Sequence, residues 1–274
     1  MSEYASVIVT YNPDLEAFRS RLDAIRSLGT DIFIVDNSEP QKPAALFGDV
    51  KVISMGANRG VAAALNAGFS AAAATGAKWV LAFDQDSTPH EGFLEIYKKF
   101  IGRFPGVGQI GCAYTGFEPF EGARHVEHVI TSGSITSISV WQEVGGFRED
   151  LFIDMVDIEF SLRLGNMGYD VWQIGEARLD HNLGEGRRGL MLGGKLRFQY
   201  VEHAPVRWYY IVRNALAVCK DNKLSHRLFC KKYLRKVRRS VAKMCLFGTD
   251  RLTKLTFIRR GIKDWKSGTM GKYQ

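Results

Sequence analysis

Two carboxylates stand one residue apart in the stretch LAFDQDSTP, residues 81–89, directly after an apolar run. On an extended turn the side chains of Asp84 and Asp86 point roughly apart, so they are poor general acid–base partners for each other. They suit a shared task better. One can accept hydrogen bonds from a ribose, while the other holds a hard divalent cation that bridges phosphate oxygens. Because such pairs are common in loops, the weight of this one depends on where the fold places it.

The pattern around this pair predicts alternating strands and helices. Apolar runs alternate with helical periodicity through the first half of the chain, which favours βα units and a largely parallel sheet. Strands are expected at residues 7–9, 32–35, 50–54 and 79–83. Three helices are expected. The first starts at Asn12-Pro13 with Asn12 as its N-cap, and the second spans residues 61–75 and ends before Gly76. The third runs from Ser87 or Thr88 to about residue 104.

Polar residues end three of these predicted strands. Thr10, Tyr11 and Asn12 follow the first, Asp36 follows the second, and Asp84 and Asp86 follow the fourth. Open parallel sheets bind ligands in the crevice outside the carboxyl ends of their strands. The three loops are therefore expected to converge on one binding edge.

The second half of the chain has a more mixed pattern. We expect strands at residues 107–113, 129–135 and 171–174, and helices at 138–144 and 157–167. Beyond Pro205 the pattern is helical throughout, with breaks near Lys223 and Gly248.

Length and composition favour an α/β domain with an appendage. The chain has 274 residues, of which 46% are hydrophobic, and this suits one domain of about 200 to 250 residues. The N-terminus lacks the features of a secretory signal, and no apolar stretch reaches the roughly 20 residues that span a bilayer. The cysteines have no metal-like spacing and are expected to be reduced: Cys112, Cys219, Cys230 and Cys245. A soluble or peripheral cytoplasmic protein is the expectation.

The formal net charge of +8 is unevenly distributed. Residues 220–274 hold 17 Lys and Arg against 3 Asp and Glu, whereas residues 1–219 hold 20 against 26. We therefore expect one domain over residues 1–219 and a basic helical extension over 220–274. Apolar residues recur among the basic ones and suggest an amphipathic helix: Leu228, Tyr233, Val237, Val241 and Leu246. It is expected to rest on an anionic membrane surface, although a solvated helical face or a nucleic-acid contact fits the same charge.

Four motifs together carry a resemblance to a known family. They are residues 7–12 (VIVTYN), 34–38 (IVDNS), 58–60 (NRG) with 66–68 (NAG), and 84–87 (DQDS). In order and spacing they resemble the family 2 glycosyltransferases with the GT-A fold, and the residue types are most similar to those of bacterial rhamnosyltransferases. The resemblance covers about residues 5–215. It implies a Rossmann-like, mostly parallel α/β sheet flanked by helices.

The resemblance implies an inverting transfer of a sugar from a nucleotide-activated donor, and it implies roles for the strand ends. Asp84 is expected to bind the ribose side of the donor, and Asp86 a divalent cation, Mg²⁺ or Mn²⁺. The residues expected to line the nucleotide pocket are Thr10, Tyr11, Asn12, Asn58 and Arg59, and Asp36 is expected to contact the nucleotide base.

An inverting transfer also needs a base that removes the proton of the acceptor hydroxyl. The stretch FIDMVDIEFSLRLGNMGYD resembles the catalytic segment of the family, in which Asp157 matches the base. Val156 stands where many relatives carry Glu, which leaves the roles of Asp154 and Glu159 open. From the residues alone, the segment can also be a solvated helix face in which Arg163 pairs with Glu159 at i,i+4.

Two more site residues are implied by the resemblance. His181 precedes a glycine-rich loop and matches a histidine that the family uses near the metal and the diphosphate. Arg213 lies in a Tyr-Tyr-x-x-Arg-Asn run, shares a helix face with Tyr209, and is expected near the diphosphate or the acceptor. Arg187 and Arg188 could neutralise the leaving diphosphate. A structural role stays open for each of these. His181 can be a structural histidine, the helix of Arg213 can simply dock on the domain through its aromatic residues, and Arg187 with Arg188 can be an exposed basic pair.

The donor and the acceptor follow from the similarity to the rhamnosyl branch. The DQDS motif, together with Leu65 where many relatives have Arg, implies dTDP-L-rhamnose, with a UDP-hexose as the alternative. The resemblance also implies that the acceptor is a lipid-linked saccharide, which belongs to a growing O-antigen, rhamnan or other surface polysaccharide. Nucleic-acid binding is disfavoured because carboxylates at the binding edge repel a polyanion. A nucleotidyltransferase is disfavoured because this chain lacks, after Val9, the basic and glycine-rich loop that such an enzyme is expected to have. A non-catalytic scaffold with the same fold stays an alternative.

Overall fold

The computed structural model describes residues 2–104, 106–181, 186–191 and 196–274, and of residues 186–191 and 196–201 it describes the backbone alone. The chain forms two compact units. The first unit comprises Met1–Phe152 and Val156–His181, and the second unit comprises Ile153–Met155 and Asn182–Gln274. The sequence predicts a boundary after residue 219 instead. The difference arises because helix α6 (Pro205–Asp221) packs against the two helices that follow it. That residues 1–219 act together as one functional domain stays a prediction.

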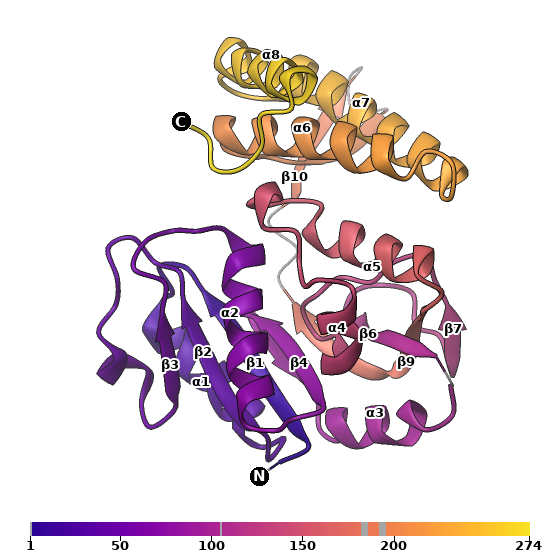
Figure 1. The fold of residues 1–274 in the computed structure, drawn as a ribbon. Helices are drawn as coiled ribbons and strands as arrows, with labels where there is room; N and C mark the ends of the chain where they lie inside the picture. The colour runs from indigo at the N-terminus through magenta and orange to yellow at the C-terminus, as the bar shows by residue number, and fades with distance from the viewer. Residues whose placement is uncertain (1, 105, 182–185, 192–195) are drawn as a thin grey trace. The chain divides into compact units, whose positions relative to one another are not determined.

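Four parallel strands form one half of the sheet in the first unit (Figure 1). They are β1 (Tyr4–Thr10), β2 (Asp31–Asp36), β3 (Lys51–Ser54) and β4 (Trp79–Asp84), in the spatial order β3-β2-β1-β4. β1 and β2 are buried along almost their whole length, as is usual for parallel strands covered on both faces. The predicted parallel βα pattern is confirmed.

The other half of the sheet mixes strand directions. Beyond β4 the order is β8 (Ile135–Ser137), β6 (Val107–Tyr114), β9 (Asp170–His181) and β5 (Ser87–Pro89), while β7 (Ala123–His125) also pairs with β9. β8 runs antiparallel to both β4 and β6, so β6 points in the same direction as β4. β9 is parallel to β6, and β5 is antiparallel to β9.

Two predictions are wrong in this half. Ser87–Pro89 is a strand and not the start of a helix, because its pairing with β9 overrides the local helix signal. The next helix, α3 (Phe93–Ile101), begins only after Gly92. Of the predicted strand at 129–135, only Ile135 belongs to a strand, since a turn at Gly133 precedes it.

The remaining helices of the described first unit are α1 (Leu15–Arg26), α2 (Val61–Ala74), α4 (Ile138–Glu143) and α5 (Val156–Asn166), with 3₁₀ turns at Ala44–Phe47 and Glu149–Leu151. The N-cap of α1 differs from the prediction. Asp14 caps the helix, and its carboxylate accepts hydrogen bonds from the backbone N–H groups of Glu16 and Ala17. Asn12 lies in the preceding loop with a φ of 44°.

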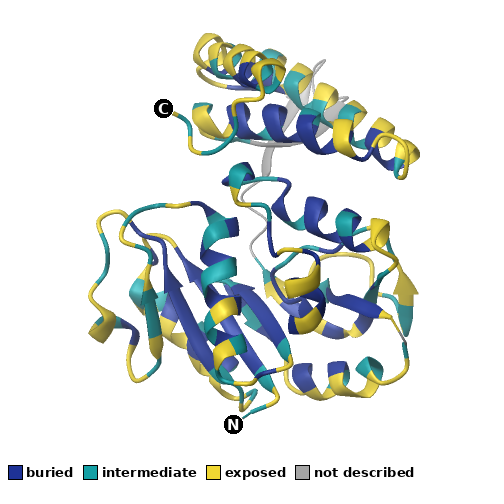
Figure 2. Cartoon of the chain, in the orientation of Figure 1, coloured by how far each residue is buried: buried dark blue, intermediate teal, exposed yellow. Residues whose placement is uncertain are grey.

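Different helices cover the two faces of the sheet. Because side chains alternate along a strand, Ile8 and Ile34 share one core with α1 and α3, whereas Val7 and Val35 point toward α2. A Cβ on Gly68 of α2 would lie 2.3 Å from a methyl carbon of Val7, so only glycine permits this close approach. Figure 2 shows the strands β1, β2 and β4 as buried, with the exposed residues on the outer sides of the helices.

In its described part, the second unit consists of a hairpin, β10 (Gly186–Met191) with β11 (Leu196–Val201), and the helices α6, α7 (Arg227–Phe247) and α8 (Arg251–Ser267). Its core gathers Trp208 and Val212 of α6, Met244 of α7 and Ile258 of α8. The predicted helix breaks near residue 223 and at Gly248 are confirmed. Among the helices described, none combines the length and the apolar character needed to cross a membrane.

Candidate active site

The register of the sheet brings predicted site residues to one edge. Thr10 and Asp36 are neighbours at the ends of β1 and β2, and Val9 of β1 pairs with Asp84 at the end of β4. The backbone N–H of Tyr11 also donates to Oε1 of Gln85 at 2.7 Å. The loops after β1, β2 and β4 therefore meet at the carboxyl edge, where open sheets bind their ligands.

His181 joins Asp84 and Asp86 although it lies far along the chain. It is the last residue of β9, and the pairing of β9 with β5 places it opposite Ser87. Nδ1 of His181 lies 3.3 Å from Oδ1 of Asp86, and Nε2 lies 3.8 Å from Oδ2 of Asp84. One ligand atom from each of the three residues lies within 4.8 Å of the other two. We call this group the Asp84–Asp86–His181 cluster.

Two buried serines hold the cluster in place. The hydroxyl of Ser132 accepts a hydrogen bond from the backbone N–H of Asp84 at 3.0 Å and lies 2.6 Å from the hydroxyl of Ser87. The Ser87 hydroxyl lies 2.9 Å from Nδ1 of His181. One chain of hydrogen bonds thus fixes both the imidazole and the start of the acidic turn.

The two carboxylates also set the charge of the imidazole. Burial opposes protonation of His181, but the hydrogen bond to Asp86 and the negative charges of Asp84 and Asp86 together outweigh it, so the pKa of His181 lies above its ordinary value. The cluster therefore attracts positive charge. Carboxylate oxygens suit Mg²⁺ and Mn²⁺, and an imidazole nitrogen beside them also suits a first-row transition metal. The residues present fit a divalent cation.

Asp36 is fully buried and shapes its own loop. Its Oδ1 accepts hydrogen bonds from the hydroxyl and the backbone N–H of Ser38, at 2.5 and 3.2 Å, and from the hydroxyl of Thr10 at 3.3 Å. Its Oδ2 accepts from the backbone N–H of Lys42 at 2.8 Å. The carboxylate thereby fixes the loop after β2, and its contact with a nucleotide base stays a prediction.

Asn37 links the other residues predicted to bind the nucleotide. Its side-chain amide donates to Oδ1 of Asn58 at 3.2 Å, and its own Oδ1 accepts from the backbone N–H of Arg59 at 2.8 Å. The backbone N–H of Asn12 donates to the hydroxyl of Ser38 at 2.8 Å. Asn12, Asn58 and Arg59 therefore lie on loops that are tied to the end of β2.

Asp157 stands in the first turn of α5, and Tyr114 at the end of β6 is near it. Burial raises the pKa of Tyr114 well above its usual value, and the negative charge of Asp157 contributes to the rise. The Tyr114 ring lies 6.0 Å from the His181 ring, and its hydroxyl donates to the carbonyl of Ser132 at 2.8 Å. Sequence reasoning missed Tyr114, although the rule that found Asp84 also applies to it, because β6 and β4 point the same way.

Glu159 and Arg163 form the predicted i,i+4 pair, at 2.9 Å, but not on a solvated face. Glu159 is 6% exposed. Arg163 also donates to the carbonyl of Gly146 at 2.7 Å and to that of Val144. The pair therefore anchors α5 to the turn after α4.

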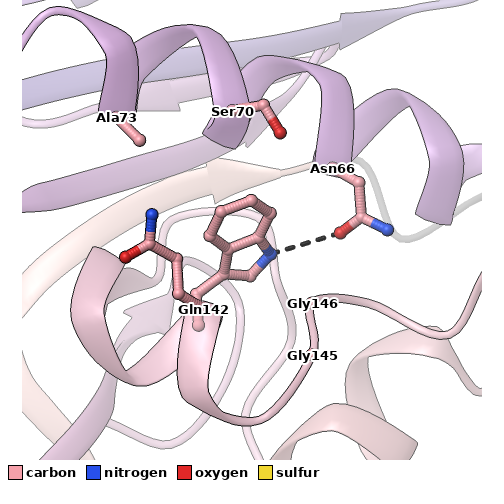
Figure 3. Close-up of a pocket in the computed structure, with 7 residues that line it drawn as sticks. Asn66, Ser70, Ala73, Gln142, Gly145 and Gly146 are labelled. Atoms are coloured by element: carbon pink, nitrogen blue, oxygen red, sulfur yellow. Dashed lines mark hydrogen bonds between the residues drawn. The ribbon is translucent and has the colours of Figure 1, made fainter.

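A separate open pocket of about 470 Å³ lies between α2 and α4 (Figure 3). On its rim, the side chain of Asn66 accepts hydrogen bonds from Nε1 of Trp141 and the backbone N–H of Phe147, at 3.2 and 2.8 Å. It also donates to the carbonyl of Phe147 and to Glu149, both at 2.8 Å. These hydrogen bonds of Asn66 hold the segment after α4 against α2. The first residue of the 66–68 (NAG) motif therefore has a structural role.

Arg213 lies fully buried in the second unit. Its Nη1 donates to the hydroxyl of Tyr209 at 3.1 Å and to the carbonyl of Gly271 at 2.7 Å, and its Nε donates to Oδ1 of Asn214 at 2.9 Å. The alternative that this run docks its helix is supported by these contacts, and the predicted contact of Arg213 with the donor stays a prediction.

Asn214 holds the segment that precedes α5. Its side-chain amide donates to the carbonyls of Ile153 and Asp154, at 2.7 and 3.0 Å. Asp154 and Met155 have φ values of 63° and 68°, a conformation that costs a residue with a Cβ about 1–3 kcal/mol. Asn214 therefore stabilises a strained segment that ends two residues before Asp157.

Asn214→Leu is expected to lower the free energy of unfolding by about 1–3 kcal/mol, because it removes the donor to two carbonyls and the acceptor of the bond from Nε of Arg213. Turnover is expected to fall as well, since Asp157 follows this segment. Urea unfolding and steady-state kinetics measure the two effects. Arg207→Leu is the control: it removes only the exposed ion pair of Asp154 and is expected to cost less than about 1 kcal/mol. Equal losses in both variants would contradict the role given to Asn214.

The segment after His181 is only partly described. The expected glycine-rich loop falls on residues 182–185, which lie outside the described residues. Arg187 and Arg188 fall in β10, which is a strand and not a loop. Their side chains also lie outside the described part, so their action on a leaving diphosphate stays a prediction.

The fold matches that of solved glycosyltransferases. The mannosyltransferase PcManGT of Pyrobaculum calidifontis, solved with GDP-Man and Mn²⁺, is 15% identical, with a TM-score of 0.57 over 97% of this chain and 83% of that chain. Residues 1–349 of S. aureus TarS, solved with UDP-GlcNAc, are 11% identical, with a TM-score of 0.59 over 98% and 82%. The chain spans 49% of a longer TarS structure. The protein thus has the GT-A glycosyltransferase fold.

The sequence comparison gives the family. The profile described as Glycosyl transferase family 2 matches residues 6–158, more than half of the chain, and the protein belongs to this family of glycosyltransferases. A curated relative, the dTDP-rhamnosyl transferase RfbF of Shigella flexneri, is 29% identical over 245 residues, which cover 81% of each chain. The family and the fold inferred from the four motifs are confirmed.

Proposed function

We propose that the protein transfers L-rhamnose, with inversion at the anomeric carbon, from dTDP-L-rhamnose to a saccharide acceptor of an O-antigen or rhamnan type of surface polysaccharide. The supporting observation is the identity with a dTDP-rhamnosyl transferase, which covers 81% of both chains. That coverage reaches beyond residues 6–158 into the second unit. The acceptor is lipid-linked and is met at the inner face of the cell membrane, which the basic extension over residues 220–274 contacts.

The carboxyl edge of β1, β2 and β4 receives the nucleotide of the donor. Asp84 accepts hydrogen bonds from the ribose. The loops fixed by Asp36 and Asn37 give the pocket its walls, and hydrogen bonds within those loops hold them ready before the donor arrives. The residues that line this pocket are Thr10, Tyr11, Asn12, Asn58 and Arg59.

Asp86 and His181 hold a divalent cation, Mg²⁺ or Mn²⁺. When bound, the cation neutralises the negative charge that develops on the departing diphosphate. The hydrogen-bond chain through Ser132 and Ser87 orients the His181 imidazole for this task. Ser87 and Ser132 are therefore positioning residues for the cation.

Asp157 is the catalytic base. It takes the proton of the acceptor hydroxyl as that oxygen forms a bond to the anomeric carbon of the sugar. The bond from the anomeric carbon to the phosphate oxygen breaks on the opposite side, and its electron pair leaves with dTDP. One displacement of this kind inverts the anomeric configuration.

A thermal-shift series with dTDP, UDP and GDP, each with and without Mn²⁺ or Mg²⁺, tests the donor and the cation together. A ligand that binds only the folded state raises the melting temperature. We expect dTDP with a cation to give the largest rise. A larger rise with UDP would replace the rhamnosyl donor by a UDP-hexose, and no rise with any nucleotide would contradict the proposed site. The anomeric configuration of the product, read by NMR, tests inversion.

A further inference from the structure

The apolar side of α7 is used inside the second unit. Val237 and Val241 are partly buried and pack against the core of the second unit, which contains Met244 of the same helix. The sequence pattern counted these two valines toward a membrane-binding apolar face. This side of α7 faces the core of its own unit, so a lipid-facing surface on α7 has to lie on the opposite side.

That opposite side is a basic ridge with a leucine at each end. The exposed residues at helical steps of four and three along one line of α7 are Leu228, Lys232, Arg235, Arg239, Ala242 and Leu246. We call this line the α7 ridge. The whole helix holds eight Lys and Arg and no Asp or Glu. Its exposed residues can be followed in Figure 2.

Apolar side chains project beside these charges. Leu228 and Leu246 are 73% and 62% exposed, and Leu224 and Leu252, which flank the two ends of α7, are 95% and 82% exposed. Among the described residues, all leucines in the set of exposed large hydrophobic side chains fall in this short region. Single exposed leucines are ordinary on protein surfaces, but four around one basic helix indicate a surface that is covered in use.

We propose that the α7 ridge is a membrane-contact surface, which binds an anionic lipid bilayer through its basic side chains and inserts the leucines at its ends among the acyl chains. The ridge lies parallel to the bilayer plane, so both ends reach it together. This inference extends the proposed function, which supplies the lipid-linked acceptor. Lipid is favoured over nucleic acid because phosphate contacts account for the basic residues but give the leucines no role.

Flotation of the full-length protein with vesicles tests the ridge. Vesicles of phosphatidylcholine alone are compared with vesicles that also contain phosphatidylglycerol, at low and at high salt. We expect binding to the anionic vesicles alone, with a loss at high salt because the attraction is screened. Binding that ignores both lipid charge and salt would overturn the proposal.

Three double variants separate the contributions. Arg235→Glu with Arg239→Glu is expected to reduce the partition coefficient at least about tenfold, because two attractive charges become repulsive. Leu228→Ser with Leu246→Ser is expected to reduce it by about tenfold while keeping the salt dependence. The control, Arg19→Glu with Lys99→Glu, makes the same charge change on exposed positions of α1 and α3 and is expected to bind as the unaltered protein. Equal losses in the control would overturn the proposal.

A short DNA duplex is the competing probe. If the duplex binds more tightly than the anionic vesicles, and the leucine variant binds it unchanged, the ridge is a nucleic-acid surface and the proposal fails. Melting temperatures of all variants are expected to match that of the unaltered protein, since the altered side chains are exposed. The readout is binding alone, so a failure here leaves the donor site untouched, and a failure of the dTDP thermal shift leaves the ridge untouched.

Discussion

Asp157→Asn is expected to lower kcat by about 10²–10⁴-fold and to leave the affinity for the nucleotide-sugar donor nearly unchanged. The amide has the shape of the carboxylate but cannot take up the proton of the acceptor hydroxyl. Donor affinity is measured by calorimetry on a non-transferable donor analogue, and kcat by release of dTDP in the presence of acceptor. A variant that turns over at a near-normal rate would remove Asp157 from its role as the base.

Glu159→Gln is the matched control, two residues further along α5. Glu159 is buried and paired with Arg163, so this variant is expected to lower the free energy of unfolding by about 1–3 kcal/mol. Its kcat per folded molecule is expected to fall far less than that of Asp157→Asn. The two variants therefore separate a chemical loss from a structural one.

Asp86→Ala is expected to weaken donor binding by about 10–100-fold in the presence of Mn²⁺ and to have little effect in the presence of EDTA. The substitution removes the carboxylate of Asp86 from the Asp84–Asp86–His181 cluster, in which one oxygen or nitrogen atom of each residue lies within 4.8 Å of the other two. Titration of Mn²⁺ against the melting temperature of the dTDP complex measures the change. An Mn²⁺ titration identical to that of the unaltered protein would show that the cation binds elsewhere.

Asp180→Ala controls for the loss of an acidic side chain beside His181. Asp180 precedes His181 in β9, but its carboxylate is bonded to His90 at 2.9 Å and to Thr115, away from the cluster. Its removal is expected to leave the Mn²⁺ titration unchanged. The comparison distinguishes a ligand from a nearby negative charge.

The parallel half of the sheet and its binding edge could be predicted from the sequence because their signals are local. A run such as Val7-Ile8-Val9 is apolar without alternation, which is typical of a strand buried on both faces. The polar residues that end such strands, Asp36 and Asp84, then share an edge by the topology of parallel sheets alone. Asp84 and Asp86 were therefore placed correctly beside each other at the carboxyl edge.

The rest of the site depends on contacts between distant residues. His181 reaches the cluster only because β9 pairs antiparallel with Ser87–Pro89, a segment whose local signal is helical. The capping role of Asp14 was missed because Asn12-Pro13 offers an equally good signal two residues earlier. The apolar side of α7 was predicted to face lipid, since periodicity shows that a helix has an apolar face but not what covers it.

The raised pKa of Tyr114 reduces the number of groups near the site that can exchange a proton during turnover. Burial is the main cause of the rise, so the phenol keeps its proton to a higher pH than an exposed tyrosine does. Although its ring lies 6.0 Å from that of His181, Tyr114 is therefore expected to be a spectator in the acid–base chemistry. An alkaline limb in a pH–rate profile of this protein is accordingly expected to report a group other than Tyr114.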